Sequence, residues 1–182
     1  MSEKHHVIAV LVENKPGVLA RISSMFARRG FNIHSLAVGP TADPALSRIT
    51  LVVDGPAMEQ VIKQLYKLVP VVKVSEIPDD DRIEREVMLL RVTSEPSRRH
   101  ELLAAAEIFD AVPIDVGVAT ITFELTGTPS RLADFLELMT PYGVVDLVKS
   151  GRVALSRYVK TRDPKSTTPR TRETGRPRLR SA

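Results

Sequence analysis

Residues 10–39 read VLVENKPGVLARISSMFARRGFNIHSLAVG, and this stretch decides the fold of the first half of the chain. The β-branched run at residues 5–12 predicts a strand. After a Pro-Gly loop, apolar residues recur at one-face helical spacing. Two arginines before Gly30 predict the end of this helix, because cations suit that end of its dipole and glycine adopts the left-handed stop. A second strand is expected over residues 31–39.

The elements that follow complete a known supersecondary pattern. A third strand is expected over residues 46–54, an amphipathic helix from Met58 to Leu68, and a fourth strand over residues 71–77. The order βαββαβ is ferredoxin-like, an α+β fold in which both helices cover one face of a four-stranded antiparallel sheet. We therefore predict a first domain over residues 1–78 and a linker at residues 79–83.

The second half repeats the same order less regularly. A strand pattern at residues 84–93 opens it, and helices are predicted to begin at Pro96 and Pro129. The remaining strand patterns fall at residues 113–118, 119–126, 144–149 and 153–156, and the last two are expected to close the second sheet. These elements predict a second ferredoxin-like domain over residues 84–159. Residues 160–182 contain almost no apolar side chains and are predicted to form a disordered, Arg-rich tail.

The charge of the chain is unevenly distributed. Its formal net charge is +4, yet residues 160–182 contain eight Lys or Arg and two acids, so residues 1–159 carry −2. The absence of cysteine excludes disulfides, thiolate metal sites and a cysteine nucleophile, and fits a reducing cytoplasm. Because neither a signal peptide nor an apolar run of membrane-spanning length is found, we expect a cytoplasmic protein without a membrane partner.

Motifs for catalysis and metal binding were sought without success. The four histidines are scattered in the sequence, and the adjacent His5 and His6 of a strand should face opposite sides of it. Glu84 and Glu86 lie in a strand pattern at positions expected to be exposed. No nucleophile elbow, Walker loop or dinucleotide fingerprint is present. We therefore predict no catalytic residue, no metal ligand and no cofactor bound by this chain.

One loop has the composition of a ligand site. Asn14 and Gly17 lie between the first strand and the first helix, where the free N–H groups and the dipole of a helix N-terminus favour an anion. The amide of Asn14 offers a donor and an acceptor, and Asn32 is expected at the same end of the sheet. The same residues are also ordinary turn and capping chemistry, and the motif alone favours that simpler interpretation.

The wider sequence favours a ligand site over a simple turn and cap. Residues 10–39, with the NIHSL block at residues 32–36, resemble an ACT domain of the acetolactate synthase small subunits, which are also called acetohydroxyacid synthase regulatory subunits. Four further blocks agree with this family: DPALSRIT at residues 43–50, QLYKLV at 64–69, EREVML at 84–89 and GRVALSR at 151–157. The resemblance covers residues 5–158. Asp110 departs from it, since similar proteins usually have a basic residue there.

The resemblance implies a binding site. In similar proteins two ACT domains pair edge to edge into a homodimer, and an amino acid binds between them. Asn14 and Gly17 would hold its carboxylate, and Asn32 of the other subunit its ammonium group. The residues expected to close around the aliphatic side chain are Lys15, Val18 and Leu19 through their backbones and Ile33 through its side chain. We expect valine as the main effector, with leucine and isoleucine weaker.

The resemblance also implies a role and a partner. Such a subunit has no catalytic site; it activates a large catalytic subunit and confers feedback inhibition by branched-chain amino acids. The catalytic partner is expected to carry thiamine diphosphate, FAD and magnesium. Two other functions stay open. One is a stand-alone ACT sensor for a different enzyme. The other is a nucleic-acid-binding module that uses the basic tail, although the strands lack the exposed aromatic residues of an RNA-recognition motif.

Overall fold

A computed structural model describes residues 5–54 and 58–157. The predicted disordered tail at residues 160–182 therefore lies outside the described residues. Six elements build the first half: β1 (His5–Glu13), α1 (Val18–Arg28), β2 (Ile33–Pro40), β3 (Leu46–Asp54), α2 (Met58–Leu65) and β4 (Val71–Ile77). Their order is the predicted βαββαβ.

The second half opens with a 3₁₀ turn, η1 (Asp79–Asp81), so the predicted linker at residues 79–83 contains this turn and the start of a strand. The elements that follow are β5 (Arg82–Thr93), α3 (Arg99–Glu107), β6 (Val112–Val116), β7 (Thr120–Gly127), α4 (Pro129–Met139), η2 (Thr140–Tyr142), β8 (Val144–Lys149) and β9 (Val153–Ser156). The domain limits themselves stay a prediction.

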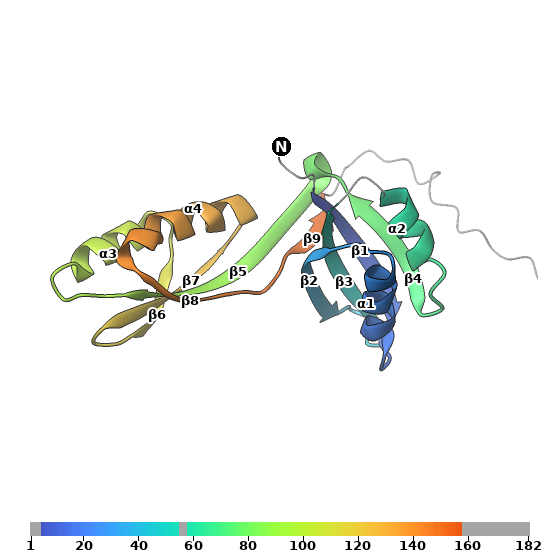
Figure 1. Ribbon diagram of the computed structural model, residues 1–182, viewed down its shortest axis with the longest axis horizontal. Coiled ribbons are helices and arrows are strands. Elements are labelled where there is room, and N and C mark those ends of the chain that lie inside the picture. Colours follow the sequence, from blue (N-terminus) through green and yellow to red (C-terminus); the bar gives the residue numbers. More distant parts are fainter. Residues whose placement is uncertain (1–4, 55–57, 158–182) are drawn as a thin grey trace, which may run out of the picture.

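The first sheet is antiparallel with the strand order β2-β3-β1-β4, and α1 and α2 cover one face of it (Figure 1). Alternate residues of the central strands, such as Ile8, Val10 and Leu51, pack against Ile22 and Phe26 of α1. This alternation is the period-two pattern that identified the strands. The two outer strands, β2 and β4, each have one edge without a partner strand among the described residues.

The second sheet has the order β6-β7-β5-β8, with α3 and α4 on one face (Figure 1). Four aromatic side chains pack in its core, of which Phe123 and Phe135 are fully buried with ring centroids 6.2 Å apart. Thr128 caps α4 by accepting a hydrogen bond from the backbone N–H of Arg131, and Pro129 occupies the first turn, where its missing N–H costs nothing. The predicted α+β fold of two ferredoxin-like units is confirmed.

The last strand pairs with a strand of the second sheet, as expected, and also makes a contact that was not expected. β9 pairs with Arg82–Arg85, the part of β5 that extends beyond the second sheet, and lies against the helix-free face of the first sheet (Figure 1). Ala154 of β9 packs there with Val7 and Val52. β5 is twelve residues long, and the backbone of its first four residues would lack a partner strand without β9. The two halves are therefore joined by β5 and β9 together.

None of the helices within residues 5–54 and 58–157 has the length and apolarity needed to cross a membrane.

Candidate functional site

The loop before α1 has the properties of an anion site. Gly17 is the N-cap of α1 with φ 81°, a left-handed conformation that favours glycine, and a Cβ there would meet nothing within 4 Å. No side chain caps this helix N-terminus, so the N–H groups of its first turn are free of side-chain partners. The loop thus presents backbone donors and open space to a ligand.

Asn14 is held in place by the neighbouring turn. Its backbone N–H donates to the carbonyl of Ala45 at 2.7 Å, and its side-chain Nδ2 donates to the carbonyl of Pro44 at 3.2 Å. One amide hydrogen and the amide oxygen stay available on an exposed side chain. The ion pair of Lys15 with Glu13, at 3.0 Å, turns the lysine charge back towards β1. Asn14 therefore faces solvent in a defined orientation.

The next two predicted residues differ in what they can offer. The side chain of Val18 is 6% exposed and belongs to the core below the helices, so only its main chain can meet a ligand. Leu19 is 41% exposed and presents an apolar side chain beside the loop.

Asn32 and Ile33 lie at the other end of the sheet, which corrects our expectation that Asn32 shares an end with Asn14. The register explains the separation: His5 pairs with Asp54 and Glu13 with Leu46, while Ile33 pairs with Val53. β2 therefore runs parallel to β1, one strand away, and begins where β1 begins. Nine residues of β1 separate the two ends by roughly 26 Å. Within one chain the predicted residues form two half-sites.

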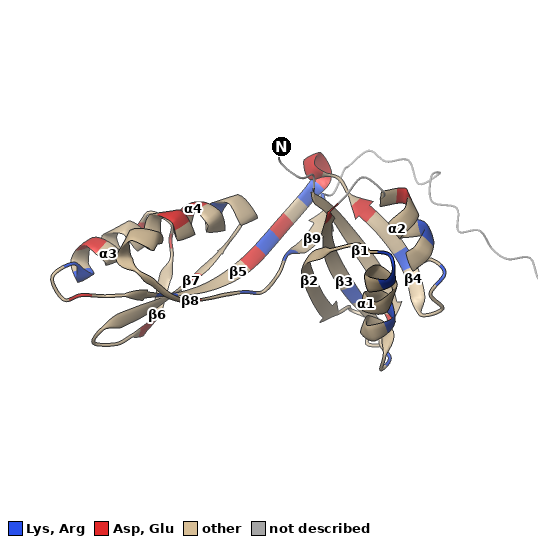
Figure 2. Ribbon diagram, viewed as in Figure 1, with Lys and Arg blue, Asp and Glu red and all other residues tan. Residues whose placement is uncertain are grey.

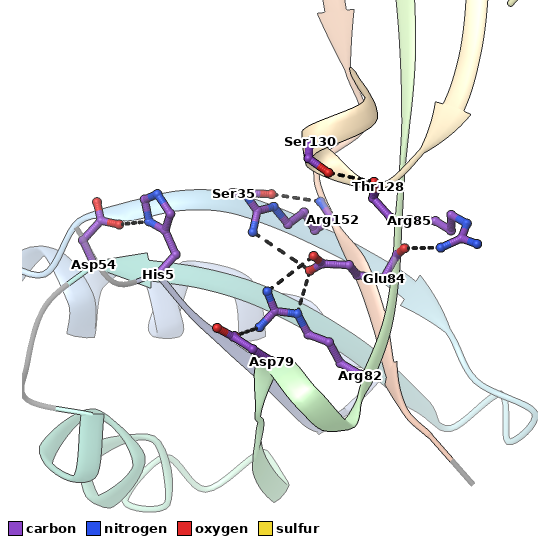
Figure 3. Close-up of polar contacts among 10 residues, drawn as sticks. All are labelled: His5, Ser35, Asp54, Asp79, Arg82, Glu84, Arg85, Thr128, Ser130 and Arg152. Atoms are coloured by element: carbon purple, nitrogen blue, oxygen red, sulfur yellow. Dashed lines mark hydrogen bonds and ion pairs between the residues drawn. The ribbon is translucent and has the colours of Figure 1, made fainter. Parts of the chain in front are cut away.

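The half-site at Asn32 includes an aspartate that sequence analysis missed. Asp54, the last residue of β3, accepts a hydrogen bond from the Nδ1 atom of His5 at 2.5 Å (Figure 3). It accepts a second hydrogen bond from Asn32 Nδ2 at 3.2 Å. The hydrogen bond from His5, followed by that from Asn32, lowers the pKa of this carboxyl group below its ordinary value. Since Nδ2 of Asn32 is engaged, its amide oxygen is left to accept from a ligand.

A basic hollow runs along α1. A cavity of about 650 Å³ is lined by Arg21, Arg28 and Arg29 of this helix region, together with Leu68 beyond α2. It begins one turn after the Gly17 loop. The spacing of Arg21 and Arg28, two helical turns apart on one face, was a visible signal in the sequence.

A second polar cluster joins the two halves (Figure 3). Glu84 of β5 lies 2.9 Å from Arg82 Nε and 4.0 Å from Arg152, and Arg82 also contacts Asp79. The backbone N–H of Arg152 donates to Ser35 Oγ of β2 at 2.9 Å. Our expectation that Glu84 and Glu86 are exposed is wrong: the side chain of Glu84 is 16% exposed, and Glu86 is 8% exposed. Both lie on the face of β5 that carries Met88 and Leu90 into the core of the second half. Charges of both signs alternate along the first residues of this strand (Figure 2).

Comparison with known proteins assigns this architecture. Residues 8–73 match the model of the AHAS small subunit-like ACT domain, and residues 85–158 match that of the small subunit of acetolactate synthase. A Thermotoga maritima acetolactate synthase small subunit of known crystal structure superposes with a TM-score of 0.80 at 39% identity, over 86% of this chain and 99% of the other.

Curated relatives agree. The acetolactate synthase small subunit of Mycolicibacterium smegmatis is 46% identical over 155 residues, 84% of this chain and 91% of that protein. The Aquifex aeolicus small subunit is 39% identical over 163 residues, 88% of this chain and 85% of the other. The first domain is thus an ACT domain of the AHAS small-subunit type. The chain belongs to the acetolactate synthase small-subunit family, the regulatory, non-catalytic subunits of a thiamine-diphosphate-dependent enzyme.

Proposed function

We propose that two copies of this chain bind a branched-chain amino acid between their ACT domains and thereby confer feedback inhibition on a catalytic large subunit. The observation that carries the proposal is the placement of the two half-sites at opposite ends of one sheet. A two-fold axis that pairs β2 with β2 of a second copy runs the two strands antiparallel. Asn32 of the partner subunit then comes alongside the Asn14–Gly17 loop, and two equal sites form.

The edge of β2 supports this pairing. It has no partner strand among the described residues, and Val38 on it is 50% exposed on the side of the sheet that α1 covers. An unpaired edge strand is a template for pairing with another chain. These two features support a homodimer that pairs through β2.

The chemistry of the joined half-sites suits a zwitterion. The effector carboxylate meets the N–H groups of α1 and the amide of Asn14. The effector ammonium donates to the amide oxygen of Asn32, which Asp54 orients from behind. The aliphatic branch packs on Leu19 and on Ile33 of the partner subunit. Burial of a valine side chain contributes about 1.5–3 kcal/mol, and a missing methylene costs about 1–3 kcal/mol. Such a pocket rejects alanine but separates valine, leucine and isoleucine only modestly. We propose valine as the main effector, with leucine and isoleucine weaker.

The bound effector acts by shifting the population of quaternary arrangements of the dimer. An effector that spans two subunits favours one quaternary arrangement over another. β9 and the first residues of β5 would transmit this change in arrangement to the second domain, because they lie on the sheet that holds the half-sites and continue into that domain. The catalytic large subunit supplies the chemistry with thiamine diphosphate, FAD and magnesium. A cytoplasmic location of the complex remains our prediction.

A pair of variants tests the shared site. Asn14→Ala and Asn32→Ala are each expected to abolish valine binding by calorimetry. Dimers that contain one chain of each kind, purified by two different affinity tags, carry one site with both asparagines and one with neither. Half the wild-type number of sites, at unchanged affinity, is the expected result. If the mixed dimer binds no valine while the wild type does, the two asparagines belong to no common site between subunits. A wild type that binds none of the three amino acids removes the effector proposal.

The two other functions are less well supported. A nucleic-acid module of this fold uses the helix-free face of its sheet, yet β9 covers Val7 and Val52 on that face here. A sensor for a different enzyme would not need the second domain, whose whole length matches the family model.

A further inference from the structure

Two histidines and an aspartate meet at the end of the first sheet that lies away from the Gly17 loop. One ligand atom each from His5, His34 and Asp54 lies within 4.8 Å of the other two. The residues come from the ends of three neighbouring strands in the order β2-β3-β1, with Asp54 on the middle strand. His5 and Asp54 are direct cross-strand partners. Rigid elements therefore hold all three side chains.

The local backbone of β2 explains why His34 joins the other two. The register shifts between Ile33 and Ser35, which pair with the consecutive residues Val53 and Val52, so His34 is the extra residue of a β-bulge. A bulge re-aims the side chain of its extra residue. The ring of His34 lies 4.6 Å from the ring of His5, tilted by 32°. Sequence analysis could not foresee this, because His5 and His34 are 29 positions apart and only the bulge brings the rings together.

We propose that His5, His34 and Asp54 bind a divalent transition-metal ion such as Zn²⁺, with water in the remaining position. Two imidazoles and a carboxylate with an open fourth position are a donor set that zinc accepts. Ligand atoms around a tetrahedral zinc ion lie about 3.3 Å apart. The present separations bracket this value, with 2.5 Å between His5 Nδ1 and Asp54 Oδ1 and at most 4.8 Å within the triad. Side-chain rotations are enough to close the site.

The surroundings of the triad favour an ion over a simple hydrogen bond. The side chains of His5 and Asp54 are 32% and 21% exposed, and His34 is exposed, so an ion can enter from solvent. The second oxygen of Asp54 accepts from Asn32, which gives the ligating carboxylate the outer hydrogen bond that orients such ligands. His6, the next residue of β1, forms a similar pair with Glu76 of β4 at 2.8 Å, but this pair belongs to no such triad within the described residues. That pair is an internal control.

The site has a consequence for effector binding that rests on the proposed function. One oxygen of Asp54 would bind the ion, and its other oxygen accepts the hydrogen bond from Asn32. Asn32 is also the proposed contact of the effector ammonium group. Occupancy of the ion site is therefore linked to valine affinity through Asp54, and by reciprocity valine changes the affinity for the ion.

The direct test is a titration of the full, untagged chain with Co²⁺, which reports tetrahedral binding through its visible absorption. We expect one Co²⁺ ion per chain, displaced by Zn²⁺. His34→Ala should weaken binding at least tenfold, and His6→Ala should leave it unchanged. The absence of cobalt binding in the wild type overturns the site. So does equal binding by His34→Ala, or an equal loss in His6→Ala, because neither result depends on the triad.

A second arm separates the ion site from the effector site. Valine is titrated by calorimetry into the same chain with and without one equivalent of Zn²⁺. A change in valine affinity of at least threefold, absent in His34→Ala, supports the link. An unchanged affinity overturns the link and leaves the ion site standing. If cobalt binds and valine binds under neither condition, the proposed effector function fails and the ion site stands.

Discussion

Asn14 and Asn32 lie at opposite ends of one antiparallel sheet, because β1 and β2 run in the same direction on either side of β3. Neither asparagine can complete the environment of the other within a single chain. The free edge of β2 runs from the end of the sheet that holds Asn32 to the end that holds Asn14, and a two-fold axis through the middle of that strand maps each end onto the other. Effector binding and dimerisation are therefore expected to be one coupled equilibrium.

Val38→Lys is predicted to dissociate the dimer. Val38 is a half-exposed apolar residue on the free edge of β2, and a lysine on each of two paired copies of this edge brings like charges together and removes apolar contact. We expect at least a tenfold rise in the dimer dissociation constant, about 1.4 kcal/mol, in sedimentation equilibrium. Valine binding should fall with it.

The matched control is Val72→Lys. Val72 is 52% exposed, close to the 50% of Val38, and lies on β4, the other outer strand of the same sheet. This variant should remain dimeric and bind valine. If Val72→Lys dissociates the dimer and Val38→Lys does not, the subunits pair through β4, and the half-sites are not joined as proposed.

Gly17→Ala is predicted to cost both stability and affinity. Since φ is 81° at this residue, an alanine there is strained by about 1–2 kcal/mol, measurable as a loss in urea unfolding. The new methyl group also projects into the open space where the effector carboxylate is expected. Gly143→Ala is the control, because Gly143 has φ 91° but lies in the second domain. It should lose at least as much stability, because a Cβ there would lie 3.3 Å from Thr93 Oγ1, and it should keep wild-type valine affinity. An equal loss of affinity in both variants would assign the effect to strain alone.

Most elements of the fold could be predicted from the sequence, whereas the residues that come together in the half-sites could not. Alternation of apolar residues identified the strands, and the Pro-Gly loop with the two arginines located α1. The placement of Asn32 failed although the predicted order already contained the answer: α1 returns the chain to the end of the sheet where β1 begins, so β2 starts there. His34 and Asp54 were not predicted as site residues, because the bulge at His34 and the cross-strand pair of Asp54 with His5 depend on the alignment of β2, β3 and β1. The contact of β9 with the first sheet was not predicted, because a strand of four residues carries no signal of what it packs against.

The second domain offers a test by pH. Glu101 accepts hydrogen bonds from Arg98 at 3.3 Å and from the hydroxyl of Tyr142 at 2.9 Å, and these bonds, that of Arg98 first, lower the pKa of its carboxyl group below the ordinary 4.5. A carboxyl group with a lowered folded-state pKa stabilises the protein above its unfolded pKa, and this contribution is lost as the pH falls through the folded-state value. Glu101→Gln should therefore be less stable than wild type at neutral pH.

The difference between the two proteins in urea unfolding should shrink as the pH falls from neutral to about 3. Tyr142→Phe keeps the ring beneath the Arg98 guanidinium, 4.6 Å away, and removes one of the two hydrogen bonds. Its stability difference should show the same trend at smaller amplitude. A difference that stays constant with pH would mean that Glu101 acts through packing instead of charge.

Glu84→Gln is predicted to separate effector binding from its effect on the catalytic partner. Glu84 is close to Arg82 and Arg152 where β5 and β9 leave the first sheet, and all three side chains are at most 16% exposed. Removal of the charge leaves two arginines without their shared acid and should cost about 2–3 kcal/mol of stability. Because the half-sites lie elsewhere on the sheet, valine affinity should change less than twofold in calorimetry. In the reconstituted enzyme, inhibition by valine should weaken, since the path from sheet to second domain runs through this cluster.

Glu59→Gln, which breaks an exposed pair with Lys63 on α2, is the control and should preserve both binding and inhibition. Full inhibition in Glu84→Gln at saturating valine would show that the signal reaches the catalytic subunit directly from the first domain, without β5 and β9.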